Sequence, residues 1–136
     1  MVWGTVGQAA ASAMTRRNID LKINYIELPA ADFDAIEQFY SKAFDWHFID
    51  YGSEYRAFHD DRLDGGFYRS DNSSAAADGA ALVILYAIKL ESARERVIAA
   101  GGRIATDIFA FPGGRRFHFL DPHGNELGVW SDSPAD

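Results

Sequence analysis

The chain has 136 residues and a mass of 15.1 kDa, a length that fits one domain or two small modules sharing a core. Apolar residues make up 48% and charged residues 24%, which excludes a disordered or low-complexity chain. The 13 basic and 20 acidic residues give a net charge of −7, and such a surface repels phosphate backbones, so we expect no nucleic-acid partner. Cysteine is absent, which excludes disulfides, thiolate metal sites and cysteine nucleophiles, and a cytoplasmic location is the simplest fit.

The apolar segments are too short for a membrane span, so we expect no membrane partner. The longest purely apolar run covers about residues 80–88, whereas a bilayer-crossing helix needs ~20 residues. Residues 1–19 are rich in alanine but lack the basic start and long apolar stretch of a signal peptide. We interpret them as an N-terminal extension, either a loose arm or a short helix on the surface.

Residues 20–70 are predicted to form a first module. Residues 21–28 alternate and are rich in isoleucine and leucine, which favours a strand, and Asp32 then supplies a helix N-cap. Apolar residues at helical spacing predict a helix over 33–44. Short strand-like segments follow at 46–50, 54–59 and 65–69, separated by turn residues.

Residues 71–79 are small and polar and read as a linker, after which the same order returns. The second module, 80–131, has a strand at 80–88 and a helical stripe from Leu90 closed by Gly101 and Gly102. Residues 132–136 follow it as a separate tail. Its three further strands are expected at 103–109, 116–120 and 126–130. A shift of 57 residues superposes the two helical stripes, placing Phe33 on Leu90 and Tyr40 on Val97. The chain is therefore predicted to be α+β, with two β-α-β-β-β modules.

Several ordered motifs carry a resemblance to a known family over about residues 22–131. They are Y-I-E-L-P at 25–29, Asp32, F-Y at 39–40, F-D-W at 44–46, L-D-G-G-F at 63–67 and D-P-H-G-N-E-L at 121–127. With these motifs the chain resembles the vicinal oxygen chelate superfamily, which holds glyoxalase I, bleomycin-resistance proteins and extradiol dioxygenases. Asp45 stands where the family usually has glycine. The resemblance implies a glyoxalase-like fold, in which each module curls a mostly antiparallel sheet into half a barrel. It also implies a homodimer with a small-molecule cleft built partly at the interface.

The resemblance also says where a metal would be held. Metal-using relatives place a histidine in the first strand, a histidine or glutamate in the fifth and a glutamate in the eighth, with one more ligand in the fourth. The matching positions here are Tyr25, Leu82 and Gly128, and residues 65–69 offer no histidine or carboxylate. Divalent ions need converging nitrogen and oxygen donors. We therefore expect no metal ligand set of the usual kind and no cofactor, unless a rearranged site holds a divalent ion.

The resemblance implies a cleft at Tyr25, Leu82 and Gly128. Strand alternation then puts Glu27 on the face of Tyr25, and Glu126 and Trp130 on the face of Gly128. Both glutamates could serve as a base, a cation contact or a displaced ligand, or could simply bind backbone groups. His118 could titrate near neutrality in a cleft or be structural. Aromatic residues could stack on a flat ligand or belong to the core. The expected cleft comprises Tyr25, Glu27, Phe67, Leu82, His118, Glu126, Gly128 and Trp130.

The leading functional hypothesis is a homodimeric protein that binds a small molecule in a concave cleft without the usual divalent metal. A cationic drug is one candidate ligand, given the net charge of −7. The alternative is a lyase or isomerase resembling glyoxalase I (lactoylglutathione lyase), or a dioxygenase relative. Such an enzyme would use a rearranged metal site or Glu27 as a proton-abstracting base. A third class, a purely structural or interaction module, stays open.

Overall fold

The computed structural model describes residues 18–135, and its elements form two modules of the same order. The expected N-terminal extension, residues 1–19, lies outside the described residues except for its last two. The first module consists of β1 (Tyr25–Ala30), α2 (Phe33–Phe44), β2 (His47–Asp50), β3 (Tyr55–His59) and β4 (Asp64–Arg69). The second consists of β5 (Val83–Tyr86), α3 (Leu90–Ala99), β6 (Arg103–Phe111), β7 (Gly114–Leu120) and β8 (Glu126–Ser131). A short 3-10 turn, η1 (Ala76–Asp78), lies between them.

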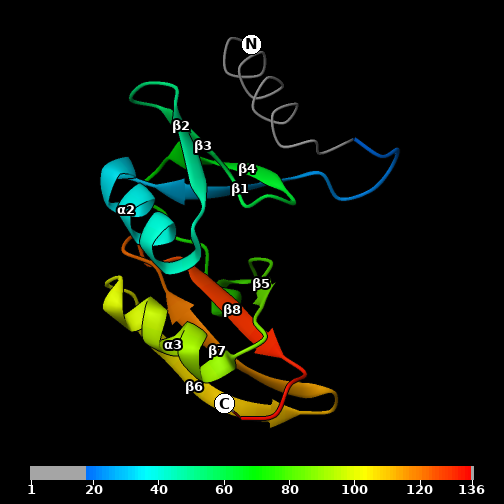
Figure 1. Ribbon diagram of the computed structural model, residues 1–136. Helices are drawn as coiled ribbons and strands as arrows, with labels where there is room; N and C mark the ends of the chain where they lie inside the picture. The colour runs from blue at the N-terminus through cyan, green and yellow to red at the C-terminus, as the bar shows by residue number, and fades with distance from the viewer. Residues whose placement is uncertain (1–17, 136) are drawn as a thin grey trace.

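Each module forms its own four-stranded sheet, in the orders β1-β4-β3-β2 and β5-β8-β7-β6 (Figure 1). In both sheets the first strand pairs in parallel with the last, and the other pairings are antiparallel. The predicted α+β class with two β-α-β-β-β modules is therefore confirmed. The two sheets stay separate and do not close into a barrel within the chain.

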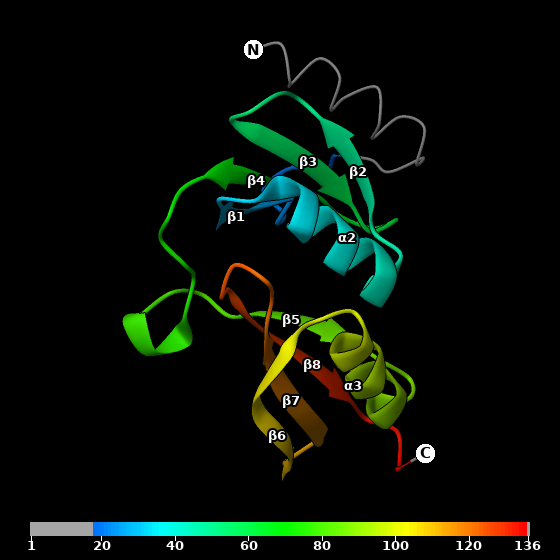
Figure 2. The ribbon, with the colours of Figure 1, turned by 90° about the vertical axis from the view of Figure 1, so that its left-hand side faces the viewer.

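Local sequence explains where α2 begins and ends. The side chain of Asp32 accepts a hydrogen bond of 3.1 Å from the backbone amide of Ala35, which satisfies one of the free amides of the first turn. Asp45, at φ 61°, takes the left-handed conformation that ends the helix. The buried stripe packs on the first sheet and also on the second module, because α2 lies between them (Figure 2). The rings of Phe39 and Phe119, 5.8 Å apart, make the core continuous across the modules.

The D-P-H-G-N turn before β8 fastens the second module to the first. The buried Asn125 side chain donates to the carbonyl of Pro29 at 2.8 Å and to Oδ2 of Asp121 at 3.0 Å. The backbone amide of Ala31 donates to Nδ1 of His123 at 3.3 Å. This turn therefore joins the two modules through buried hydrogen bonds.

Strand ends differ from the predicted ranges for local reasons. β1 begins at Tyr25 rather than at 21, because Leu21 has a φ of 62° and lies in a turn. β4 begins one residue early, at Asp64, where it pairs with Tyr25. β6 and β7 extend to a tight hairpin at 112–113, where Gly113 has a φ of 112°. No helix among the described residues is long and apolar enough to span a membrane.

Candidate functional site

The first sheet presents one face to α2 and the other away from it. Ile26 and Leu28 join the core on the α2 side, so alternation places Tyr25 and Glu27 on the opposite side. We call this opposite side the first face. It carries Tyr25, Glu27, Tyr51, Tyr55, His59 and Asp64.

A hydrogen-bond chain runs along the first face from Tyr25 through Tyr55 to Glu27. The two tyrosine hydroxyl groups lie 2.7 Å apart, and that of Tyr55 donates to Oε2 of Glu27 at 2.8 Å. Burial, the largest cause, raises the pKa of the Tyr25 hydroxyl. The pKa of the Tyr55 hydroxyl is also raised, by burial and then by its bonds to Tyr25 and Glu27. Both groups therefore stay protonated near neutral pH, and Glu27 is the acceptor that ends the chain.

The same face holds a carboxylate that the sequence analysis missed. Asp64 is 8% exposed and lies in register with Tyr25 on one side and His59 on the other. The expectation that the fourth strand offers no carboxylate was wrong by one residue, because β4 already begins at Asp64. Burial lowers the pKa of His59, helped by the nearby His47, whose ring centroid lies 5.1 Å away. His59 is therefore neutral at pH 7.

The second sheet has an equivalent face turned away from α3, which we call the second face. It carries Ile84, Tyr86, Phe109, Phe111, Arg116, His118, Glu126, Gly128 and Trp130. Gly128 lies at its centre, in register with Ile84 and His118. A Cβ added at Gly128 would meet only ordinary contacts of 3.5–3.6 Å, so the face is not closed by steric crowding there.

Glu126 and His118 form a carboxylate–imidazole pair on the second face. Oε2 of Glu126 lies 2.9 Å from Nδ1 of His118, and Oε1 accepts a bond of 3.1 Å from the backbone amide of Ala76. The bond to His118 is the main cause that lowers the pKa of Glu126. An ionised carboxylate at Nδ1 fixes the proton on that nitrogen, an assignment inferred from the bonding. In the neutral imidazole, Nε2 of His118 is then an acceptor, and it is buried without a partner among residues 18–135.

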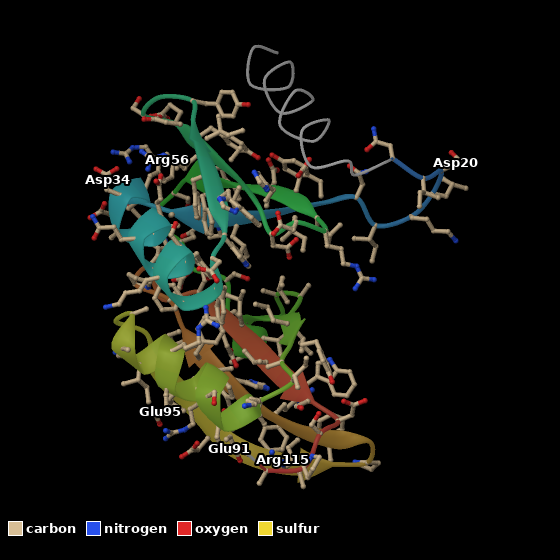
Figure 3. All side chains as sticks on the ribbon, in the orientation of Figure 1. Asp20, Asp34, Arg56, Glu91, Glu95 and Arg115 are labelled. Carbon is tan, nitrogen blue, oxygen red and sulfur yellow. The ribbon has the colours of Figure 1, made fainter. Side chains whose placement is uncertain are left out.

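Two adjacent arginines of β7 point to opposite sides of the sheet. Arg115 faces α3 and pairs with Glu91, with Nη2 and Oε1 3.1 Å apart (Figure 3). Arg116 lies on the second face, its guanidinium centred 5.1 Å from the ring of Phe109 and 5.6 Å from that of Phe111. The guanidinium is thus held between aromatic rings.

The structure distributes the predicted cleft residues over both faces and the core. Tyr25 and Glu27 lie on the first face, and His118, Glu126, Gly128 and Trp130 on the second. Phe67 does not line a cleft: it is fully buried beside Tyr40, with ring centroids 5.6 Å apart, because alternation along β4 turns it toward α2. Leu82 is half-buried just before β5. Because α2 lies between the first sheet and the second module, the first face points away from the second module (Figure 2).

The residues at the family's metal positions do not fit a divalent ion. They offer a tyrosine hydroxyl already bonded to Tyr55, an aliphatic side chain at Leu82 and no side chain at Gly128. Across residues 18–135, no group of three or more histidine, aspartate or glutamate side chains is placed to hold a metal. We therefore derive no chemistry through a metal.

A broad apolar groove runs between the modules on the side of the edge strands β1 and β5, with a volume of about 1380 Å³. Its walls include Ile26 and Leu28 of β1 and residues 83–89. Apolar side chains beside it are strongly exposed: Ile23 is 84% and Ile88 71% exposed. Contiguous exposed apolar surface beside unpaired strand edges is typical of an association surface.

Paired β-α-β-β-β modules, with a clasp at D-P-x-G-N, define a recognised class of proteins. Residues 22–129 match the family model described as Glyoxalase/Bleomycin resistance protein/Dioxygenase superfamily. The chain belongs to this superfamily. A comparison with curated protein sequences finds no match.

Solved structures share the fold at low sequence identity. A glyoxalase-related enzyme from Fulvimarina pelagi is 17% identical, with a TM-score of 0.68 over 82% of this chain and 88% of that one. The fosfomycin resistance protein FosX from Listeria monocytogenes, complexed with Mn(II) and a dihydroxypropylphosphonic acid, is 16% identical, with a TM-score of 0.69 over 85% and 93%. Lactoylglutathione lyase from Agrobacterium tumefaciens is 20% identical, with a TM-score of 0.64 over 84% and 96%. These likenesses establish the fold.

Proposed function

We propose that the protein binds a small organic molecule on the second face, without a divalent metal at Tyr25, Leu82 and Gly128. The observation that carries this proposal is the composition of that face. Aromatic rings of Trp130 and Tyr86, 5.2 Å apart, lie on the same face as the buried polar atoms of His118. Ligand sites typically combine such apolar walls with a few placed polar groups.

A homodimer is part of this proposal. Within residues 18–135, the edge strands β1 and β5 each pair with one neighbour, and Ile23, Ile84, Tyr86 and Ile88 are exposed along or beside them. A second copy offers the same apolar edges and would cover them isologously. Since the first face points away from the second module of its own chain, a second copy is also what would bring a first face opposite a second face.

The test combines ligand binding with metal analysis. Tag-free protein is analysed for metal by elemental mass spectrometry before and after soaking in nickel, zinc, manganese and iron salts. It is then screened by thermal shift and by NMR of the Trp130 indole against flat anionic, cationic and neutral compounds. We expect less than one bound ion per ten chains and a saturable shift with at least one compound. One tightly bound ion per chain, or no response of Trp130 to any compound, would overturn the proposal.

A second candidate function is metal-independent proton abstraction by Glu27. The hydrogen bonds from Tyr25 through Tyr55 to Glu27 favour this function. The protonated hydroxyl of Tyr55 donates to the carboxylate of Glu27 and so orients that carboxylate on an exposed surface. The natural assay is lactoylglutathione lyase turnover of the methylglyoxal–glutathione adduct by protein free of metal. Turnover that falls at least a hundredfold in Glu27→Gln supports this function. Turnover at background in the wild type, or unchanged turnover in Glu27→Gln, removes it for this substrate.

A further inference from the structure

Two buried nitrogen atoms of the second face have no hydrogen-bond partner in the described part of the chain. They are Nε of Arg116 and Nε2 of His118. The two residues alternate along β7, so both side chains emerge on the same side of the sheet. A buried polar atom without a partner is costly, and in native proteins such an atom calls for an explanation, which a bound group can supply.

Arg116 differs from the other well-covered arginines. Arg56, Arg94 and Arg115 have side chains at most 27% exposed, and each pairs with a carboxylate. Among residues 18–135, Arg116 forms no ion pair, and its charge is faced by the rings of Phe109 and Phe111. Aromatic rings hold the planar guanidinium in place but leave its hydrogen-bonding edge uncompensated. An oxyanion is the group that such an edge recognises best.

The backbone opposite His118 is also irregular. His118 pairs with Thr106 of β6, and the register shifts on both sides of that pair, between Ile104 and Thr106 and between Thr106 and Phe109. β6 therefore carries an extra residue on each side of the imidazole. Bulges of this kind re-aim side chains and are over-represented next to functional sites. The bond from Glu126 to Nδ1 orients the imidazole ring and so sets the direction of Nε2.

We propose that the second face binds a planar organic anion that carries a hydroxyl group. Arg116 binds its carboxylate, Nε2 of His118 accepts a hydrogen bond from its hydroxyl, and Trp130 stacks on its ring. The Cα atoms of alternate strand residues lie about 6.6 Å apart, which suits substituents at opposite ends of one aromatic ring. The ligand class is therefore the hydroxyaryl carboxylates. This inference rests on the proposed ligand-binding function of the second face and adds the charge and shape of the ligand.

The negative net charge does not oppose this assignment at the site. Screening limits exposed charges to a range of about 8 Å at physiological salt, whereas the guanidinium would touch the ligand. The carboxylates on or beside this face are already engaged: Glu126 by His118 and the amide of Ala76, and Asp132 by the hydroxyl of Tyr86 at 2.5 Å. Arg103 is in register with Leu120 at the exposed end of this face, whereas Arg116 is the cation that lies beside His118 and Trp130, with no ion pair within residues 18–135.

The experiment uses the full chain and two probes of opposite charge and matched shape, 4-hydroxybenzoate and 4-hydroxybenzylamine. Binding is followed by NMR at the indole N–H of Trp130 and the imidazole of His118. The variants are Arg116→Gln, Arg116→Lys and His118→Gln. Arg103→Gln, at the exposed start of β6, is the matched control for loss of one positive charge. Thermal denaturation checks that each variant folds.

We expect 4-hydroxybenzoate to shift both resonances saturably and 4-hydroxybenzylamine to leave them unchanged. Arg116→Gln should raise the Kd about tenfold, since it removes a charge-assisted bond, whereas Arg103→Gln should change it less than threefold. Arg116→Lys should raise the Kd by an intermediate factor, because it keeps the charge but loses the planar guanidinium. His118→Gln should weaken 4-hydroxybenzoate but leave benzoate unaffected. If Arg116→Gln fails to fold, the inference is tested by comparing the binding of benzoate and 4-hydroxybenzoate to His118→Gln.

Three results would overturn the inference. The first is equal or tighter binding of 4-hydroxybenzylamine at Trp130, and the second is an unchanged Kd for 4-hydroxybenzoate in both Arg116→Gln and His118→Gln. In these cases a ligand still occupies the second face and the proposed function survives. The third is no response to either probe while other compounds of the screen do bind, which again removes only the anion assignment. If no compound shifts the indole resonance of Trp130, the proposed function is overturned as well.

Discussion

The hydroxyl group of Tyr40 donates a hydrogen bond of 2.8 Å to Oδ2 of Asp121, and this buried contact joins α2 to the turn before β8. The carboxylate of Asp121 also accepts bonds from the backbone amides of His123 and Asn125 at 2.9 and 3.0 Å. Burial is the main cause that raises the pKa of both the Tyr40 hydroxyl and the Asp121 carboxyl. The two modules are therefore held together by a polar network inside an otherwise apolar core.

Tyr40→Phe removes one donor from this network and leaves an oxygen of Asp121 under-satisfied. We expect the free energy of unfolding to fall by about 1–3 kcal/mol, measured by urea denaturation at pH 7. Tyr68→Phe is the matched control, since Tyr68 is 41% exposed on β4. Equal stability of the two variants would show that the bond between the modules contributes nothing.

Substitution by alanine should have different effects on stability at Gly66 and at Gly128. A Cβ at Gly66 would collide with the ring and hydroxyl of Tyr55, whereas a Cβ at Gly128 would meet ordinary contacts. Gly66→Ala should therefore displace Tyr55, break its bond to Glu27 and destabilise the protein by roughly 1–3 kcal/mol. Gly128→Ala should change stability by less than about 1 kcal/mol. Urea denaturation measures both, and a larger loss in Gly128→Ala would contradict the geometry of the two faces.

Most of the fold was predictable because it depends on local patterns. A few neighbouring residues are enough to predict each of three features: the helical stripe containing Tyr40, the N-cap at Asp32 and the D-P-H-G-N turn. The site was less predictable, because a strand shows which residues share a face but not where it starts. One residue of error at β4 hid Asp64, and the choice of side for Phe67 depended on which face α2 covers.

Of all the features of the site, the partners of the buried polar atoms were the hardest to predict from the sequence. Nothing in the dipeptide Arg115–Arg116 says which arginine meets a carboxylate and which meets two phenylalanines. Adjacent side chains of a strand point to opposite faces, and the register of β7 against β8 decides which arginine takes which face. The bond between His118 and Glu126 likewise joins residues eight positions apart that meet across a hairpin.

His59 should destabilise the protein when the pH falls. Burial, followed by the nearby His47, lowers its pKa below the ordinary 6.5, although Asp64 and two other acidic residues oppose the shift. The unfolded chain then binds a proton before the native one, so stability falls as the pH drops through about 6.5 and levels off below the native pKa. NMR titration should show His59 titrating below the ordinary value. A pKa at or above 6.5 would contradict the burial argument, and His59→Gln should show a weaker loss of stability between pH 8 and 5.

The exposed edge residues should control assembly. We expect the wild type to be dimeric in light scattering coupled to size-exclusion chromatography. The double variant Ile23→Ser, Ile88→Ser should be monomeric, because each buried aliphatic side chain contributes roughly 1.5–3 kcal/mol. Ile98→Ser is the control, since Ile98 is 43% exposed on α3, away from the edge strands. A monomeric wild type at 100 μM would contradict the dimer.

Glu126 should act on the second face through His118 rather than by touching a ligand. Glu126→Gln replaces a charged acceptor at Nδ1 with a neutral amide, so the imidazole should lose its fixed tautomer. The nitrogen shifts of His118 in NMR report this directly. Because the bond to His118 lowers the pKa of Glu126, its contribution to stability is present above the unfolded carboxyl pKa and is lost as the pH falls through the native value.

The difference in unfolding free energy between wild type and Glu126→Gln should therefore be about 1 kcal/mol at pH 7 and should shrink toward zero near pH 3. Glu95→Gln, on the exposed side of α3, controls for the general loss of a negative charge and should show no such convergence. If the difference stays constant with pH, the carboxylate is not held by His118. The unpartnered Nε2 would then have no fixed direction, and its role as an acceptor for a ligand hydroxyl would fail with it.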